Sequence, residues 1–379
     1  MANIKNTLEH SIDFIEYFKH LKDPRQIGKS TYRLDEILLL VLCAVLSGAD
    51  DWVAIALYGE EKQEFLQNFR PFANGTPSHD QLGNVFSAID PEQFQQCFVN
   101  WVTALQNAIK GVVALDGKVL RRSFDKAGKK GAINMVSAWC SEQNLVLAQT
   151  AVDKKSNEIT AIPKLLDLLT IKGAIITIDA MGCQRDIARK IIEKEADYIF
   201  SMKGNQGNMH KDIKRFFKKQ KKVKSKNITM RCHKKNESSH GRKEVRKITV
   251  CSDVEWLQKR HDWPGLKSII MIEYSSRTPQ GETRRETRYY ISSLDKEAEF
   301  MAGAIRDHWG VENGLHWVMD MLFRDDECRI RKGNAPANFT TIKHVASNLL
   351  RLAKGKISMR QKRHKAAWSE DYLLELLTN

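Results

Sequence analysis

The sequence predicts an α/β protein with a mixed sheet, preceded by an all-helical N-terminal module and interrupted by a β-rich basic insertion. Two observations lead to this fold class. Apolar residues recur at helical spacing up to about residue 95, and short β-rich runs separated by helices follow from residue 111. The excess of positive charge is concentrated in segments 201–250 and 351–365. The chain is therefore expected to hold more than one structural unit.

The N-terminal module is predicted from apolar periodicity and from two helix caps. Helical spacing is visible in 4–18 and 34–46 and continues through 52–69. Ser78 follows a proline and is expected to cap a helix, and Asp90 followed by Pro91 is the typical start of another. The second of these helices is expected to run from 91 to about 109. Residues 1–95 are therefore assigned to a helical module.

The mixed sheet is predicted from a change in periodicity after residue 111. Three β-rich runs come first, and helices then alternate with two further apolar runs. The expected strands are 112–115, 133–140, 145–152, 174–178 and 197–200, with helices at 158–169 and 184–195. A β-β-β-α-β-α-β order implies a mixed sheet with helices packed against it.

The second half of the chain is expected to add strands and then return to helices. Probable β-hairpins lie near 228–250, 267–275 and 286–292, and helices are expected at 297–322, 337–353 and 367–377. We assign 96–350 to the α/β domain, with the β-rich basic insertion at about 205–300. Residues 351–379 are assigned to a basic helical tail.

The charge distribution indicates a polyanionic partner. Residues 201–250 contain 17 Lys and Arg against three acids, and 351–365 contain seven bases and no acid, while the net charge of the whole chain is +15. Excess charge confined to two segments is expected where a nucleic acid binds, since each phosphate that is neutralised releases counterions. A solvated basic face or a disordered tail is the alternative.

The composition also excludes several classes of protein. The N-terminus lacks the uninterrupted apolar core of a signal peptide, and the longest apolar stretch, 37–46, is half a membrane span. No membrane association is therefore expected. Seven scattered cysteines without a CxxC pair indicate neither a zinc ribbon nor a disulfide framework, and they fit a reducing cytoplasm.

Two aspartates follow apolar strands and are the first candidates for chemistry. Asp116 comes after the run VVAL, and Asp179 comes after AIITI. Side chains at this edge of an α/β sheet project into a crevice where ligands bind. Two carboxylates that converge there repel one another, and a divalent cation such as Mg²⁺ or Mn²⁺ relieves that cost. A cap for the following helix is the alternative for each aspartate taken alone.

A third carboxylate is expected from the stretch 305–320. His308, Glu312 and His316 share one face of a helix at four-residue spacing, with Arg306 before them and Asp320 after them. A zinc site on this face and an amphipathic helix with satisfied histidines are the two alternatives.

Four motifs in order resemble the DDE transposases of bacterial insertion sequences. They are Asp-Gly-Lys at 116–118, Ile-Asp-Ala-Met-Gly-Cys-Gln at 178–184, Lys-Gly-Asn-Gln at 203–206 and His-Trp-Gly-Val-Glu-Asn at 308–313. More narrowly, the chain resembles the H-repeat-associated branch of the transposase 11 family over almost its whole length. The resemblance implies a ribonuclease-H-like core in which Asp116, Asp179 and Glu312 are the catalytic, metal-binding triad. It also implies metal-dependent DNA strand cleavage and strand transfer, with two Mg²⁺ ions that Mn²⁺ can replace.

Seven residues are expected to contact DNA. Lys118 and Arg121 follow the first aspartate, and the alternative for these two residues is a solvated turn. The motif at 203–206 should reach the same sheet edge. Its alternative is a polar loop before a helix at 207–218. The predicted contacts are Lys118, Arg121, Lys203, Asn205, Gln206, Arg306 and His308.

The DNA contacts on the third-carboxylate stretch depart from the family pattern. The family places a lysine seven residues after the glutamate and an arginine three residues before it, where this chain has Met319 and Trp309. Arg306 is the nearest substitute for that arginine.

Double-stranded DNA, comprising element ends and target, is the partner implied by the resemblance. A homodimer on DNA and a location in the bacterial cytoplasm, at the nucleoid when bound, are implied as well. Two other functions remain open from the sequence. One is a catalytically silent DNA-binding remnant of a decayed element, and the other is a nuclease that hydrolyses without joining.

Overall fold

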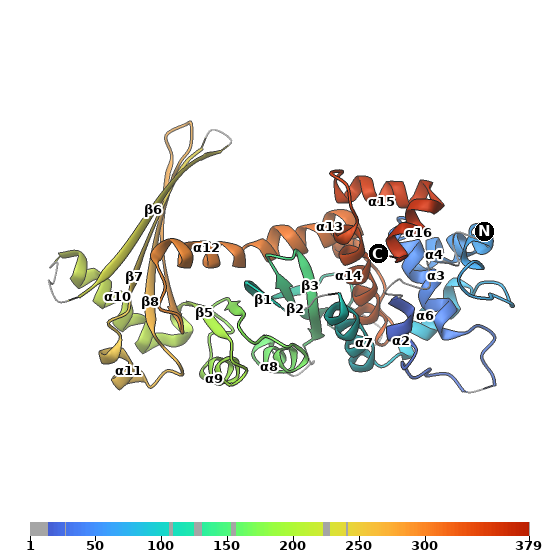
Figure 1. Cartoon of the computed structure of the whole chain (residues 1–379), viewed down its shortest axis with the longest axis horizontal. Helices are drawn as coiled ribbons and strands as arrows, with labels where there is room; N and C mark the ends of the chain where they lie inside the picture. Colours follow the sequence, from blue (N-terminus) through green and yellow to red (C-terminus); the bar gives the residue numbers. More distant parts are fainter. Residues whose placement is uncertain are drawn as a thin grey trace.

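The protein is elongated, with a helical body at one end, a sheet in the middle and an arm of long strands at the other end (Figure 1). The computed structural model describes residues 14–26, 28–105, 109–124, 131–152, 157–222, 228–239 and 242–378. Among these residues, no helix combines the length and the apolar character needed to cross a membrane.

The helical body combines both ends of the chain. It contains α2 (Phe14–Phe18), α3 (Leu34–Leu46), α4 (Trp52–Glu61), α5 (Gln63–Leu66), α6 (His79–Ala88), α7 (Pro91–Ala104), α14 (Ala335–Leu352), α15 (Met359–Trp368) and α16 (Glu370–Thr378). Both predicted caps are confirmed, because Ser78 accepts from the amide of Gln81 and Asp90 from those of Glu92 and Gln93. Helix α14 packs against α3, α6 and α7. The start of the predicted helix 4–18 lies outside the described residues, and the helix predicted to reach about 109 ends at 104.

The basic C-terminal segment contributes to this helical body. Lys362 Nζ donates to the carbonyl oxygens of Leu350 (3.0 Å) and Ala353 (2.6 Å). Arg363 is buried, and it donates to the carbonyl of Val45 and to Asp50 Oδ1 (3.0 and 2.7 Å). These two bases stabilise the helix packing, so they are not exposed to a polyanion. The division of the chain at 350 stays a prediction, although α14 runs across it.

The central sheet has the predicted β-β-β-α-β-α-β order. Its elements are β1 (Val112–Leu120), β2 (Ile133–Cys140), β3 (Leu145–Ala151), α8 (Glu158–Leu168), β4 (Ile175–Ile178), α9 (Arg185–Glu193) and β5 (Asp197–Met202). The strands lie in the order β3-β2-β1-β4-β5. β1, β4 and β5 are parallel, and β2 is antiparallel to both of its neighbours. The sheet is therefore mixed, as predicted.

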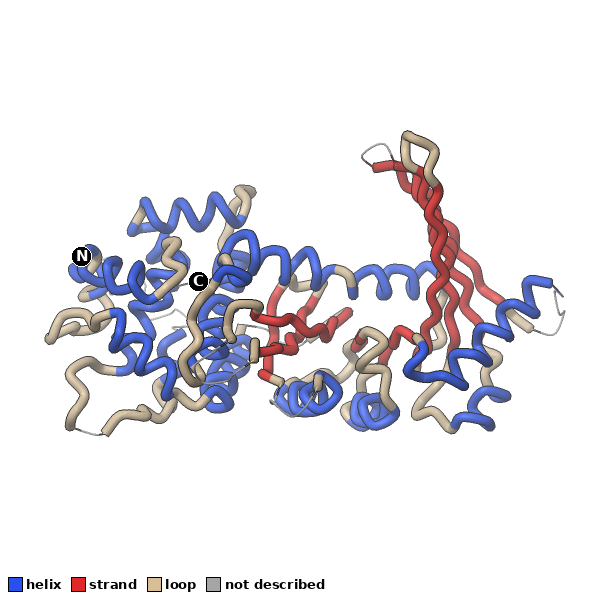
Figure 2. The backbone as a smooth tube through the Cα atoms, turned by 180° about the vertical axis from the view of Figure 1, so that it is seen from behind, coloured by secondary structure: helices blue, strands red, loops and turns tan. Residues whose placement is uncertain are grey.

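The arm continues this sheet without a break (Figure 2). Its strands are β6 (Met230–Ser239), β7 (Arg242–Cys251), β8 (Ser268–Arg277) and β9 (Thr283–Ser292), and β9 pairs antiparallel with β5. In the part of the chain that the structure describes, nine strands thus form one sheet, in the order β3-β2-β1-β4-β5-β9-β8-β7-β6. The sequence predicted β-hairpins in this region but not their continuity with the central sheet. Helices α10 (Gly207–Lys222) and α11 (Glu255–His261) accompany the arm.

One long helical segment links the arm to the helical body. It consists of α12 (Ala298–His308), a π-helical segment η2 (Glu312–His316) and α13 (Trp317–Phe323), so the predicted helix 297–322 is interrupted. Helix α12 contacts β1, β4, β6 and β7, whereas α8 and α9 cover the other face of the central strands (Figure 1). The layer between α12 and the sheet is apolar and includes Ile175, Ile199, Ile270, Met301 and Ile305.

Candidate functional site

Asp116 and Asp179 lie on neighbouring strands at the same level of the sheet. The last pair between the parallel strands β1 and β4 joins Leu115 to Ile178, so each aspartate is the next residue along. The expected position of Asp116 at a strand end is wrong, because β1 continues to Leu120. β4 does end at Ile178. Asp116 therefore lies just beyond the last residue of β1 that pairs with β4.

Neither aspartate caps the helix that follows it. Asp179 Oδ1 accepts from the amides of Met181 (2.9 Å) and Gly182 (3.3 Å), while the N-cap residue of α9 is Gln184. Asp116 Oδ1 accepts from the amide of Gly117 (3.0 Å) within a continuing strand. The helix-cap alternative is therefore wrong for both residues.

Glu312 reaches the same cavity from the π-helical segment. A cavity of about 230 Å³ is lined by Asp116, Thr177, Ile178, Asp179, Ile199, Ser201, Lys203, Glu286, Arg288, Tyr290, Ile305, His308, Trp309, Val311 and Glu312. The structure thus brings the three predicted carboxylates to one cavity.

Side chains from other elements donate to carbonyl groups in and beside this irregular helical segment. Ser141 donates to the carbonyl of Asp307 (2.8 Å), and Arg351 donates to that of Gly314. Such competition interrupts an α-helical ladder, and π-segments often mark functional sites. The close packing also requires glycine, since a Cβ on Gly314 would lie 2.8 Å from the ring of Trp139.

The cavity has an unbalanced negative charge. Burial, together with the charges of Asp179, Glu158 and Glu312, raises the pKa of Asp116 to about 7 against the opposing hydrogen bond from Gly117. Sequence reasoning missed Glu158. Its Oε1 accepts from Asn134 Nδ2 (2.9 Å) and would lie 2.2 Å from a Cβ on residue 117. The glycine after Asp116 was the one available signal for this close approach.

The donor set suits a divalent cation. Within the described ranges, no three His, Cys, Asp or Glu side chains are arranged as ligands of one ion. Four carboxylates, those of Asp116, Asp179, Glu286 and Glu312, nevertheless line one small cavity. Burial and repulsion from neighbouring acids raise the pKa of Asp116 there. A hard dication with oxygen ligands would relieve that repulsion, so the chemistry of these side chains suits such an ion.

The two histidines of the stretch 305–320 contact the strands that lead to the aspartates. His308 Nδ1 lies 3.0 Å from Thr177 Oγ1, and His316 Nδ1 lies 3.5 Å from Asp116 Oδ2. Burial lowers the pKa of His308, and burial together with Lys118 lowers that of His316 to about 4. Both rings are therefore neutral at neutral pH, and the predicted DNA contact of His308 stays a prediction.

Lys118 belongs to a buried cluster of charges behind the cavity. Its Nζ pairs with Asp320 and lies 3.5 Å from Asp325 Oδ2, and its side chain is 13% exposed. Lys343 Nζ lies 2.8 Å from Asp325 Oδ1, with both groups buried. The solvated turn considered for Lys118 is therefore wrong. The predicted contact of Lys118 with a phosphate stays a prediction, and it would require the ion pair between Lys118 and Asp320 to break.

The motif at 203–206 braces the turn that carries Asp179. Asn205 Nδ2 donates to the carbonyl of Ala180, and Gln206 Nε2 donates to that of Cys183 (2.7 Å). Lys203 lines the cavity itself. The structure thus gives the two amides a supporting role that the sequence did not suggest, and the contacts of all three with DNA stay predictions.

The other two predicted DNA contacts lie apart from the carboxylates. Arg121 is exposed, with its Nε 3.3 Å from Asp326 Oδ2. Arg306 Nη1 donates to both oxygens of Glu237 on β6 (3.0 and 2.8 Å), which lies on the arm.

Comparisons with known proteins identify relatives of this chain. Residues 107–349 match the family model described as Transposase DDE domain, and residues 15–102 match the one described as DDE_Tnp_1-associated. The H repeat-associated putative transposase YhhI of Escherichia coli K12 is 43% identical over 96% of this chain and 97% of its own length. The putative protein YbfL of the same strain is 44% identical over the same shares. A solved piggyBac transposase synaptic complex with hairpin DNA covers 99% of this chain and 80% of that chain at a TM-score of 0.44 and 10% identity, too low a likeness to support an argument.

Proposed function

This chain belongs to the Transposase DDE domain family, and from that premise we propose that it cuts DNA strands and joins them to a target during transposition. The observation that carries the proposal is the placement of Asp116 and Asp179 on neighbouring parallel strands, with Glu312 at the same cavity. A raised carboxylate pKa in a cleft is typical of a site built for an ion or for catalysis.

The proposed fold of the catalytic unit is a ribonuclease-H-like core. The order β3-β2-β1-β4-β5, with β1, β4 and β5 parallel, supports it. We retain the division into a helical module (1–95), a catalytic domain (96–350) with an insertion at about 205–300, and a basic tail (351–379).

The proposed cofactors are two Mg²⁺ ions, with Mn²⁺ as a substitute, held by Asp116, Asp179 and Glu312. When bound, such ions activate the attacking oxygen and stabilise the charge that develops on the phosphate. The residues of the chain orient this site. The amides of Met181 and Gly182 hold Asp179, and Asn205 fixes the turn behind it.

DNA is the proposed substrate, and the chain contacts it through Lys118, Arg121, Lys203, Asn205, Gln206, Arg306 and His308. Lys203 is the best placed of these, because it lines the carboxylate cavity. A homodimer on paired element ends and a location in the bacterial cytoplasm, at the nucleoid when bound, complete the proposal. The seven free thiols fit that reducing compartment.

Strand transfer with purified protein tests the proposal. Labelled DNA that carries the repeats flanking the coding region is incubated with protein and Mg²⁺, and joined products are quantified. Asp179→Asn is expected to reduce joining at least about 10²–10³-fold, as removal of a group that supports transition-state charge does. Asp186→Asn is the matched control, since this carboxylate is exposed and pairs with Arg189 (2.8 Å).

Two outcomes would overturn the assignment. DNA binding without cleavage by the wild-type chain would identify a catalytically silent remnant. Hydrolysis without joining would identify a nuclease.

A further inference from the structure

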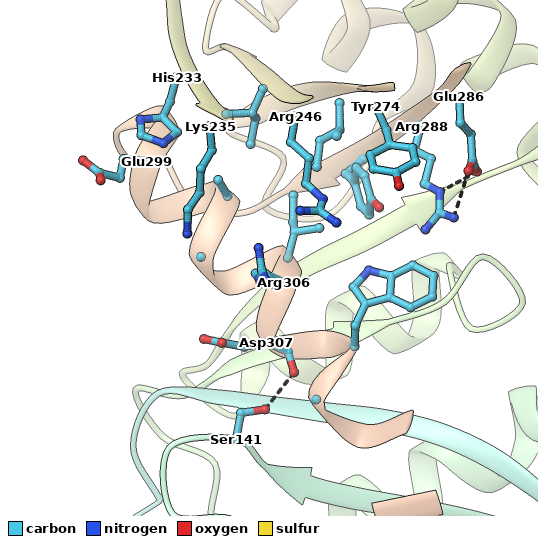
Figure 3. A pocket seen from close by; sticks show the side chains of 18 of the residues that line it. Ser141, His233, Lys235, Arg246, Tyr274, Glu286, Arg288, Glu299, Arg306 and Asp307 are labelled. Carbon is cyan, nitrogen blue, oxygen red and sulfur yellow. Dashed lines mark hydrogen bonds and ion pairs between the residues drawn. The ribbon is translucent and has the colours of Figure 1, made fainter. Parts of the chain in front are cut away.

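A large basic groove lies between the arm and helix α12 (Figure 3). Its volume is about 1140 Å³. Bases outnumber acids on its walls: the basic side chains are His233, Lys234, Lys235, Arg246, Arg284, Arg288 and Arg306, and the acidic ones are Glu286, Glu299 and Asp307. A long polyanion fits this charge better than a small neutral ligand does.

Strand register places several of these side chains on one face of the arm. Lys235 pairs with Arg246, Arg246 pairs with Tyr274, and Tyr274 pairs with Glu286. Cross-strand partners project from the same face of a sheet. Figure 3 shows Lys235 and Arg246 extending from this face toward Arg306 on the helix.

The groove leads to the carboxylate cavity. Glu286, Arg288, Tyr290, Ile305 and Trp309 line both spaces. Arg288 is held in place there, with its guanidinium 4.5 Å from the ring centre of Trp309. A strand that lies along the groove can therefore extend to Asp116 and Asp179.

Three cations from three elements converge on one carboxylate beside the groove. Glu237 accepts two hydrogen bonds from Arg306 (3.0 and 2.8 Å), lies 3.2 Å from Lys235 Nζ, and pairs with Arg246. The hydrogen bonds from Arg306 and Lys235 lower the pKa of Glu237 to about 2. Glu237 is therefore ionised at neutral pH, and α12, β6 and β7 each direct a positive charge at it.

The geometry of this cluster suits a backbone phosphate. A phosphodiester, like a carboxylate, presents two oxygens that share one negative charge, and arginine binds both groups through its planar donors. The three cations that pair with Glu237 are 37–58% exposed, and ion pairs of exposed side chains contribute little stability. A phosphate can therefore replace this carboxylate at small cost.

We propose that Lys235, Arg246 and Arg306 form a binding site for a DNA backbone phosphate, which Glu237 occupies until DNA displaces it. The inference rests on the proposed function, because it assigns the groove to the DNA that the carboxylates would cut. Glu237 thereby weakens binding of any DNA that does not fill the site.

Equilibrium binding without divalent metal tests the site separately from catalysis. The full chain in EDTA is titrated into fluorescein-labelled duplex DNA at several salt concentrations, and anisotropy is recorded. Arg306→Gln is expected to weaken binding and to lower the slope of log K against log salt by about 1. Glu237→Gln is expected to tighten binding about fivefold, because loss of the exposed ion pairs frees Lys235 and Arg306, while Arg246 keeps its pair with Glu244 (2.6 Å).

Glu273→Gln is the matched control for Glu237→Gln. Glu273 lies on β8, pairs with Lys221 (2.5 Å) and does not line the groove. The affinity of the Glu273→Gln variant for duplex DNA should equal that of the wild type. Circular dichroism and thermal unfolding check that each variant is folded, and Arg306→Lys should restore most of the salt slope.

The outcomes separate this inference from the proposed function. Unchanged binding by Arg306→Gln, or equal affinities for Glu237→Gln and Glu273→Gln, would overturn the phosphate site even if strand transfer is observed. Loss of binding by the groove variants in a protein that never joins DNA would support the site and remove the proposed reaction. A wild-type chain that binds no DNA would overturn both.

Discussion

The carboxylate cavity and the buried charge cluster behind it use the same residue types to opposite effect. They meet on β1, where Asp116 belongs to the cavity and Lys118, two residues later, belongs to the cluster. In the cluster, Lys343 and Lys118 hold the pKa of Asp325 below its usual value, although burial raises it. In the cavity, burial and neighbouring carboxylates raise the pKa of Asp116 to about 7.

The two sites differ in whether opposite charges are paired. Paired charges in the cluster stabilise the fold, whereas carboxylates gather in the cavity. A buried ion that lacks a counter-charge costs free energy, so evolution retains such an arrangement where function requires it. In the cluster, each carboxylate has a lysine within ion-pair distance. In the cavity, Asp116 faces three acids. An added cation is therefore expected to stabilise the charged form of Asp116.

The largest expected effect on stability comes from removing one lysine of the buried charge cluster. Lys343→Met leaves Asp325 buried without its nearest cation (2.8 Å), so the free energy of unfolding should fall by about 3–5 kcal/mol. Urea unfolding followed by circular dichroism measures it. The double variant Asp325→Asn with Lys343→Met should recover much of the loss.

An exposed pair provides the reference for that experiment. Lys172 lies 2.8 Å from Glu195 with its side chain 70% exposed, and Lys172→Gln should cost less than about 1 kcal/mol. Equal losses for Lys343→Met and Lys172→Gln would show that the cluster does not differ from the surface.

A smaller effect is expected from the pH dependence of the cavity. Between the usual pKa of 3.8 and the folded value of about 7, Asp116 binds more protons in the folded chain than in the unfolded one. Stability therefore falls as pH rises through that window, by about 2–4 kcal/mol. In metal-free buffer, the wild type should lose stability relative to Asp116→Asn between pH 4 and pH 7. Saturating Mg²⁺ should reverse the loss in the wild type alone, and a difference that does not change with pH would contradict the expectation.

The smallest expected effect is that of one neighbouring charge, Glu158, on the pKa of Asp116. Glu158→Gln removes a nearby negative charge and keeps the acceptor for Asn134, so the pKa of Asp116 should fall by about one unit or less. Carboxyl chemical shifts measured against pH report it. No fall would mean that burial and the other two acids account for the whole shift.

The sequence predicted the cavity better than the cluster because the cavity depends on local pattern. Each aspartate directly follows an apolar run, and parallel pairing of two such runs brings their next residues together. Lys118 meets Asp320 across 202 positions, and no local pattern encodes such a contact. Glu312 was found through the motif around it. The irregular helical segment that carries it is contacted by Ser141 and Arg351, which are distant in sequence.

The strands and caps of the fold were predicted for the same local reason. Apolar runs and the caps at Ser78 and Asp90 gave most element boundaries to within a few residues. The continuity of the nine-stranded sheet was missed, because pairing of β9 with β5 depends on tertiary structure. The charge pattern likewise could not distinguish Lys362 and Arg363, which are buried, from bases that face solvent.

The pairing of β9 with β5 keeps β5 from becoming an exposed edge of the sheet. Residues 199–202 pair on one side with β9, so a copy that lost the arm would present this hydrophobic strand as a bare edge. Unprotected edges of this kind recruit other chains and aggregate. Deletion of the arm strands is therefore expected to give a chain that aggregates.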